Sequence, residues 1–267
     1  MKIAVLPDCQ IRPGDNTDYL TYAGEYLVAK KPDVWVCIGD FADMPSLSSY
    51  DVGKKSFEGR RYSKDIGAAH AGMEALLTPL KEFNEKARKN KEKQYKPRRV
   101  LTLGNHEDRI DRAINNDSKL EGLISMDDLQ YADYGWEVYP YLEPVVIEGI
   151  AFCHFFASGV LGRPITSARM LLTKKHMSCV AGHQQGRDIA YATRADGTDM
   201  MGLIAGSFYE HDEDYLNPQT NNHWRGFYML HDVVNGSADE MAVSIKYLKL
   251  RYAANKAKEL EFNQEVA

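Results

Sequence analysis

Cysteine is scarce in this sequence and shows none of the spacings that would give it a structural role. The 267 residues contain four cysteines, Cys9, Cys37, Cys153 and Cys179, and no two of them form a CxxC pair. A small secreted scaffold held by disulfides has a far higher cysteine density, and a zinc ribbon has paired cysteines. The sequence therefore predicts four reduced thiols, each a small buried residue, in a cytoplasmic protein.

Long apolar runs and a strong excess of charge are missing as well. No run approaches the roughly 20 apolar residues that span a bilayer, and the opening MKIAVLPD lacks the core and cleavage site of a signal peptide. The formal net charge of −5 excludes a protein that coats nucleic acid by bulk charge, although it permits a local basic groove. We expect no membrane partner, and the sequence predicts no oligomeric state.

What the chain does contain is a regular alternation of buried strands and helices in its first half. Short apolar runs at 2–7, 33–39 and 98–103 are typical of buried strands. Segment 15–31 repeats apolar residues at helical spacing, and a longer helix is expected from about Ile66 to Lys93. Strands separated by crossover helices predict a parallel sheet and the α/β class.

The second half changes to short strands joined by tight turns. Residues 136–155 read as two or three strands with a turn at Glu148–Gly149. Strands continue as far as Leu248, with hairpin turns expected at 195–198 and 234–237.

No internal repeat or clear linker divides the chain. We therefore expect one domain over 1–250, with an inserted loop and helical segment at about 45–98 and a C-terminal helix or tail over 251–267. The insert begins as a polar, tyrosine-bearing loop and ends in the mostly basic run KARKNKEKQYKPRR at 86–99. Two interpretations of that run stay open: a solvated helix end, or a basic rim that meets phosphate.

Polar side chains follow the apolar strands at the points where five of them end. The carboxyl ends of strands in an open α/β sheet converge on one crevice, so these side chains are expected to meet. Carboxylate oxygens, amide oxygens and imidazole nitrogens are ligand types of a divalent-metal site. The candidates are Asp8 and Gln10, Asp40 and Asp43, Asn105 and His106, His154, and His183 with Gln185.

In order along the chain, these positions read DCQ, GDFAD, GNHE, CHF and GHQQ. Five such motifs in this order resemble the signature of the calcineurin-like metallophosphoesterases, and the whole chain resembles phage-encoded members of that family with no assigned substrate. The resemblance implies a four-layer αββα sandwich, with mixed β-sheets flanked by helices, that holds two metal ions. For a phage-encoded protein the compartment would be the host cytoplasm.

The resemblance also implies two metal shells that share one residue. Asp40 would bridge both ions, and the first shell would be completed by Asn105, His154 and His183. The second ion would be held by Asp8, Gln10 and Gln185, and there the chain departs from the family, which usually has histidine at the positions of both glutamines.

The two glutamines change the metal that is expected. An amide oxygen is neutral and harder than an imidazole nitrogen, so the second site should suit Mn²⁺ or Mg²⁺ better than zinc or iron. We expect Mn²⁺ first among Mn, Mg, Fe, Zn and Ni, with one tight site and one weaker site. A second interpretation is that the glutamines mark an enzyme that has lost its activity.

Three further residues are candidates for catalysis. By the resemblance, His106 protonates the leaving oxygen and Asp43 orients His106, which a degenerate scaffold would not need. Arg109 could reach a phosphoryl oxygen, or it could form a surface ion pair with Asp108 or Asp111. Glu107 is expected to hold the turn.

The stretches SFYEHDEDY and NNHWRGF combine aromatic and charged residues after strands. They line a substrate cleft or form a surface loop, and the residues concerned are Tyr209, His211, His223 and Arg225. The acidic run Asp212, Glu213 and Asp214 would repel polyanions.

These features together predict a metal-dependent phosphoesterase that uses metal-activated water. A phosphodiesterase is favoured, and a nuclease acting on DNA or nucleotides is its specific form, because a basic, tyrosine-bearing insert suits nucleic acid. The net acidity favours a small substrate instead. The alternatives are a phosphomonoesterase that acts on a phosphoprotein or small phosphate, and a non-catalytic metal-dependent binding protein.

Overall fold

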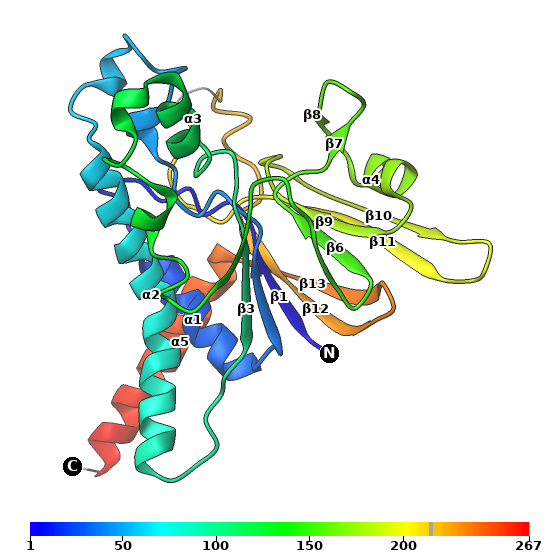
Figure 1. Cartoon of the computed structure of the whole chain (residues 1–267). Helices are drawn as coiled ribbons and strands as arrows, with labels where there is room; N and C mark the ends of the chain where they lie inside the picture. The colour runs from blue at the N-terminus through cyan, green and yellow to red at the C-terminus, as the bar shows by residue number, and fades with distance from the viewer. Residues whose placement is uncertain (214–215, 267) are drawn as a thin grey trace.

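The computed structural model describes residues 1–213 and 216–266 and shows an α/β protein with two mixed β-sheets (Figure 1). The first sheet has six strands in the order β13-β12-β1-β2-β3-β4. Strands β1 to β4 are parallel, whereas β12 and β13 join antiparallel. Their bounds are β1 Ile3–Leu6, β2 Val34–Cys37, β3 Arg98–Thr102, β4 Glu137–Tyr139, β12 Gly226–Val234 and β13 Ser237–Ser244.

The second sheet has five strands in the order β10-β11-β9-β6-β5, with a parallel centre and antiparallel edges. A separate two-stranded ribbon joins β7 (Ala157–Ser158) to β8 (Arg163–Pro164). The five strands are β5 Val145–Ile147, β6 Ile150–Cys153, β9 Ser178–Ala181, β10 Arg187–Thr193 and β11 Asp199–Ala205.

Five α-helices occur in the described part of the chain: α1, α2 and α5 lie beside the first sheet, α4 lies beside the second, and α3 lies among the loops beyond the strand ends (Figure 1). Helices α1, α2 and α5 share a buried cluster with the first sheet, and α4 shares one with the second. Helix α3 begins directly after the GNHE turn. The bounds are α1 Asp18–Lys30, α2 Tyr62–Lys89, α3 Arg109–Asn116, α4 Ala168–Lys175 and α5 Ile245–Val266.

The two faces of the first sheet bury different partners because side chains alternate along a strand. On β1, Ala4 and Leu6 pack with the residues of α1 and α2. Ile3 and Val5 instead pack with Phe152 and other residues of the second sheet. The strands read as continuous apolar runs because both faces are covered.

Most of the predicted elements are confirmed. The helix expected from about Ile66 to Lys93 is α2, and hairpins at 195–198 and 234–237 join β10 to β11 and β12 to β13. All four cysteines are free and buried. In the part of the chain that the structure describes, no helix is both long enough and apolar enough to cross a membrane.

The expectation that strands continue to Leu248 is wrong, because α5 already begins at Ile245. Ile245 and Leu248 are both buried, and their spacing of three residues places them on one helical face. Tyr252, one turn further along, packs on Tyr22 of α1 with ring centroids 4.1 Å apart. The first turns of this helix are therefore part of the core.

The basic run 86–99 lies at the far end of the first sheet from the strand ends that carry the motifs. It leads from the end of α2 into the beginning of β3, whereas Asn105 follows the other end of β3 (Figure 1). A basic rim around the motif residues is therefore not formed by this run.

Candidate metal centre

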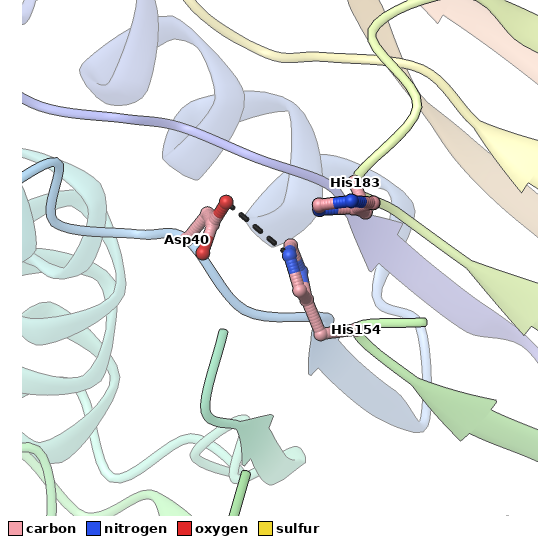
Figure 2. A group of neighbouring side chains, drawn as sticks. All are labelled: Asp40, His154 and His183. Carbon is pink, nitrogen blue, oxygen red and sulfur yellow. Dashed lines mark ion pairs between the residues drawn. The ribbon is translucent and has the colours of Figure 1, made fainter. Parts of the chain in front are cut away.

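Three strand ends bring a carboxylate and two imidazoles together. Asp40 follows β2, His154 follows β6 and His183 follows β9, and one ligand atom of each lies within 4.8 Å of the others. Figure 2 shows the three side chains pointing toward one another, with His154 Nε2 3.2 Å from Asp40 Oδ2. Asp40 and His154 are buried, so this group could hold a metal ion.

The hydrogen bonds of His154 show why a cation fits here. Its Nδ1–H donates to the Ile38 carbonyl at 3.0 Å. Its Nε2 therefore faces two oxygens, Asp40 Oδ2 and the Asn105 Oδ1 atom at 2.8 Å. His183 Nδ1 also lies 2.8 Å from Asn105 Oδ1. So many lone pairs meeting in a buried place require a positive charge, either a proton or a divalent ion.

The pKa values of the two imidazoles are shifted in opposite directions. Burial alone lowers the pKa of His154, but the adjacent Asp40 carboxylate outweighs burial and raises it to about 10. Burial and the neighbouring His154 lower the pKa of His183 to about 4, so its ring is neutral and its lone pair is available. A cation between them would take the place of the His154 proton.

Asp8 and Gln10 form the other half of the cluster. Asp8 is fully buried, accepts the His183 backbone N–H at 3.0 Å, and has one oxygen 4.0 Å from His154 Nδ1. Burial raises its carboxyl pKa to about 7. Gln10 is also buried, and its Oε1 has no hydrogen-bond partner among the described residues. The Gln10 backbone N–H donates to the Asp40 carbonyl oxygen at 2.8 Å, so this buried oxygen without a partner belongs to a residue that directly contacts the candidate metal group.

Gln185 has a protein partner that the sequence did not predict. Its Oε1 accepts the hydroxyl hydrogen of Tyr209 at 2.6 Å. Tyr209 is fully buried, with its ring stacked on His211 at 4.3 Å between centroids. The interpretation of this segment as a surface loop is therefore wrong for Tyr209.

The close approach of the loops depends on the glycines of the motifs. A Cβ atom on Gly104 would lie 2.1 Å from Asp40 Oδ1, and one on Gly182 would lie 2.3 Å from Asp8 Oδ1. Both distances are shorter than any van der Waals contact, so a side chain at either position would displace a candidate ligand. Asp40 and His183 themselves have positive φ angles of 50° and 67°, a strain typical of functional sites.

Glu107 ties two of the loops together, as predicted for the turn. Its buried carboxylate accepts the backbone N–H groups of Asp40, Ala42 and Gly104 at 2.9 to 3.0 Å. The Tyr131 hydroxyl donates to it as well, at 3.2 Å. The residue is thus a structural anchor of the site.

His106 and Asp43 form a side-chain pair beside the candidate metal group. His106 Nδ1 contacts Asp43 Oδ1, and its Nε2 lies 3.7 Å from Asp40 Oδ2. Burial lowers the pKa of His106, but Asp40 and Asp43 outweigh burial and raise it above the ordinary value. Burial raises the pKa of Asp43, but His106 and the arginines around it hold that pKa well below its usual range.

Arg109 lies in this site and not on the surface. Its Nη1 donates to the Asp43 carbonyl oxygen at 2.7 Å, and its Nη2 lies 3.2 Å from His106 Nε2. The expected ion pair with Asp108 or Asp111 is not observed among the described residues, and Asp108 pairs with Arg112 instead. Arginine only donates, so this contact needs Nε2 of His106 as the acceptor. It therefore corresponds to the neutral form of the ring, with the proton on Nδ1.

Arg12 is a site residue that sequence reasoning missed. Its guanidinium bonds both Asp43 and the buried Glu213, and Glu213 lies 3.1 Å from His211 Nε2. Glu213 is therefore not one of the exposed charges that were expected to repel polyanions, whereas Asp212 is exposed and Asp214 lies outside the described residues. The only signal for Arg12 was its place four positions after Asp8.

His211 should make the stability of the protein depend on pH. Burial lowers the pKa of its imidazole, but hydrogen bonds to Asp15 and Glu213 outweigh burial, and the pKa is raised despite nearby Arg12. A raised folded pKa gives stability that is fully present below the unfolded value of about 6.5 and lost as the pH rises through the folded value. The difference in unfolding free energy between wild type and His211→Gln should therefore shrink with rising pH.

Urea unfolding at about pH 5.5 and about pH 8.5, on either side of the ordinary histidine pKa, measures this difference. Asp15→Asn removes one of the two carboxylate partners and should reproduce part of the effect. A difference between His211→Gln and wild type that is the same at both pH values would contradict the role assigned to this imidazole.

Two comparisons with known proteins found nothing similar to this chain. A scan against protein-family models and a search of curated proteins found no match to the chain. The inference of function therefore depends on the residues of the site.

Proposed function

We propose that this protein is a metal-dependent phosphoesterase of the calcineurin-like type, with a preference for phosphodiesters. In this proposal the two sheets and their helices form the four-layer αββα sandwich of that family. Asp40, Asn105, His154 and His183 hold the tighter cation. Asp8, Gln10 and Asp40 would hold the weaker one. Mn²⁺ is the metal that we expect for this mixture of oxygen and nitrogen ligands.

One observation carries the proposal. The carboxylate of Asp40 lies 3.2 Å from His154 Nε2 in the candidate metal group and 3.7 Å from His106 Nε2 in the histidine–aspartate pair. A purely structural ion site does not require a second imidazole near the carboxylate of Asp40. Here that imidazole is His106, and Asp43 orients it. Metal-dependent hydrolysis of a phosphate ester uses both a cation and a proton donor.

Divalent cations bound here would polarise the phosphoryl oxygens and activate a water molecule. His106 is placed to hold the proton for the leaving oxygen on Nε2, while Asp43 fixes the ring through Nδ1. A protonated Nε2 no longer accepts from Arg109, so the Nη2 group of that arginine is released. Arg109 keeps its hold on the Asp43 carbonyl through Nη1 and can donate Nη2 to a phosphoryl oxygen.

The loop that follows Asp43 favours a phosphodiester substrate that carries further phosphates, such as a nucleotide or a nucleic acid. It carries four cations between Asp43 and the beginning of α2: Lys54 and Arg60 pair with Asp51, whereas Lys55 and Arg61 form no ion pair with the described residues. Cationic side chains there would meet phosphates that extend beyond the scissile one. We propose this loop, in place of the run 86–99, as the basic element of a nuclease or nucleotide phosphodiesterase.

The test is hydrolysis of bis(p-nitrophenyl) phosphate and p-nitrophenyl phosphate by the Mn²⁺-loaded protein. We expect turnover with a preference for the diester and none after removal of metal with a chelator. Preference for the monoester would favour a phosphomonoesterase, and silence on both would favour a metal-dependent binding protein. Labelled single- and double-stranded DNA then tests the nuclease form. Calorimetric titration with Mn²⁺ should show one tight and one weaker site.

A further inference from the structure

The side chain of Gln185 is held by a rigid partner. Its Oε1 accepts the hydroxyl hydrogen of Tyr209 at 2.6 Å, and Tyr209 has no exposed surface. The phenol ring is stacked on His211 with an interplanar angle of 6°, and the Arg225 guanidinium lies 5.1 Å from the ring centroid. Because the ring is fully buried and contacts both groups, the hydroxyl that reaches Gln185 is held in place.

The hydrogen bonds around Tyr209 also fix which atom of the amide it contacts. His223 Nδ1–H donates to the Thr220 carbonyl at 2.9 Å, so Nε2 of the neutral ring is an acceptor. That acceptor lies 2.9 Å from the Ser207 hydroxyl, which can donate to it, and 3.5 Å from the Tyr209 hydroxyl. The Tyr209 hydroxyl makes the shorter of these two contacts with Gln185, to which it donates a hydrogen bond, and an amide accepts a hydrogen bond through its oxygen.

This direction decides what Gln185 offers to the site. A primary amide has one oxygen and one NH₂ group, and its oxygen is taken by Tyr209. In the described part of the chain no acceptor is found for Gln185 Nε2. The free end of the side chain is thus a hydrogen-bond donor, which repels a cation and attracts an anionic oxygen.

We propose that Gln185 binds a substrate phosphoryl oxygen through its Nε2–H group and does not ligate the second cation, and that Tyr209 is the positioning residue that sets this orientation. The inference rests on the proposed phosphoesterase function. The two glutamines then have opposite roles. Gln10 offers an orphaned buried oxygen to a cation, and Gln185 offers a donor to the phosphate. The second cation keeps fewer ligands and is weak for that reason.

The test separates cation binding from phosphate binding in Gln185→Ala, Tyr209→Phe and the control Gln184→Ala. Gln184 is the adjacent amide, and its side chain makes no hydrogen bond with the described residues. Each protein is titrated with Mn²⁺ alone and then, Mn²⁺-loaded, with inorganic phosphate. Gln185→Ala should bind Mn²⁺ like wild type but bind phosphate about tenfold more weakly, as expected for one lost charge-assisted hydrogen bond.

Tyr209→Phe should weaken phosphate binding in the same direction but less, because the amide is still present and only loses its orientation. Gln184→Ala should match wild type in both titrations. The inference is overturned if Gln185→Ala loses an equivalent of Mn²⁺, or if its phosphate affinity equals that of Gln184→Ala. A wild-type protein that binds Mn²⁺ but neither binds phosphate nor hydrolyses either ester overturns the proposed function as well.

Discussion

Replacement of Asp40 by asparagine is expected to remove both cation binding and turnover. The side chain keeps its shape and can still accept the His106 backbone N–H, which donates to Asp40 Oδ1 at 2.9 Å. What it loses is the buried negative charge next to His154 and His106. Since even residues that only support metal ligands contribute 10- to 100-fold to affinity, we expect Mn²⁺ affinity to fall by at least about 100-fold. Diester hydrolysis should fall to background.

Calorimetry with Mn²⁺ and the diester assay measure the two losses on the same preparation. Asp111→Asn is the matched control, because it makes the same change in charge on the exposed side of α3. Retained near-ultraviolet circular dichroism would show that the substitution at Asp40 has not unfolded the site. Wild-type Mn²⁺ affinity in Asp40→Asn would mean that the cation, if one binds, lies elsewhere, and the proposed centre would have to be abandoned.

The central elements of the fold could be predicted because they depend on local patterns. The runs that became β1 and β2 are apolar on both faces, β3 is buried over its last three residues, and helix α2 carries its apolar residues at helical spacing. The end of β13 could not be placed, because Ile245 and Leu248 are apolar residues that suit a strand as well as a helix. Their packing on α1, a tertiary contact, decides in favour of α5.

The gathering of the site could be predicted from a rule of topology. The rule holds for three of the predicted residues, but across two sheets: Asp40 follows β2 of the first sheet, and His154 and His183 follow the neighbouring parallel strands β6 and β9 of the second. The hydrogen bonds of Glu107 to the turn follow from the same arrangement, since its backbone neighbours are all loop residues of the motifs. Sequence order and residue type were sufficient for this part.

The surroundings of the site could not be predicted, because they come from contacts between distant segments. Arg12 reaches Glu213 across 201 positions of sequence, and Tyr209 reaches Gln185 from another strand end. No spacing or periodicity encodes such pairs. The orientation of the Gln185 amide could not be predicted either, because it follows from the hydrogen bond that the buried Tyr209 hydroxyl donates to its oxygen.

Replacement of His106 by asparagine should reduce turnover severely and leave Mn²⁺ binding as it is. The imidazole lies 3.7 Å from Asp40 Oδ2 and contacts Asp43, so its loss removes no candidate ligand. The backbone N–H that donates to Asp40 remains in the variant. A positioned proton donor contributes roughly 10²- to 10⁴-fold to rate, and we expect a loss in that range for diesters with a basic leaving group and a smaller loss for the p-nitrophenyl diester. A loss of Mn²⁺ in this variant would show that His106 is a ligand.

The leaving group distinguishes proton donation from a general disturbance of the site. A p-nitrophenolate leaves readily without a proton, whereas a more basic phenolate or an alkoxide needs one. The ratio of wild-type to His106→Asn rates should therefore grow along a series of diesters with increasingly basic leaving groups. Asp43→Asn, which leaves the imidazole in place without its carboxylate partner, should show a weaker trend in the same direction. A constant ratio across the series would show that His106 does not donate the proton. Its contribution would then be limited to the shape or charge of the site.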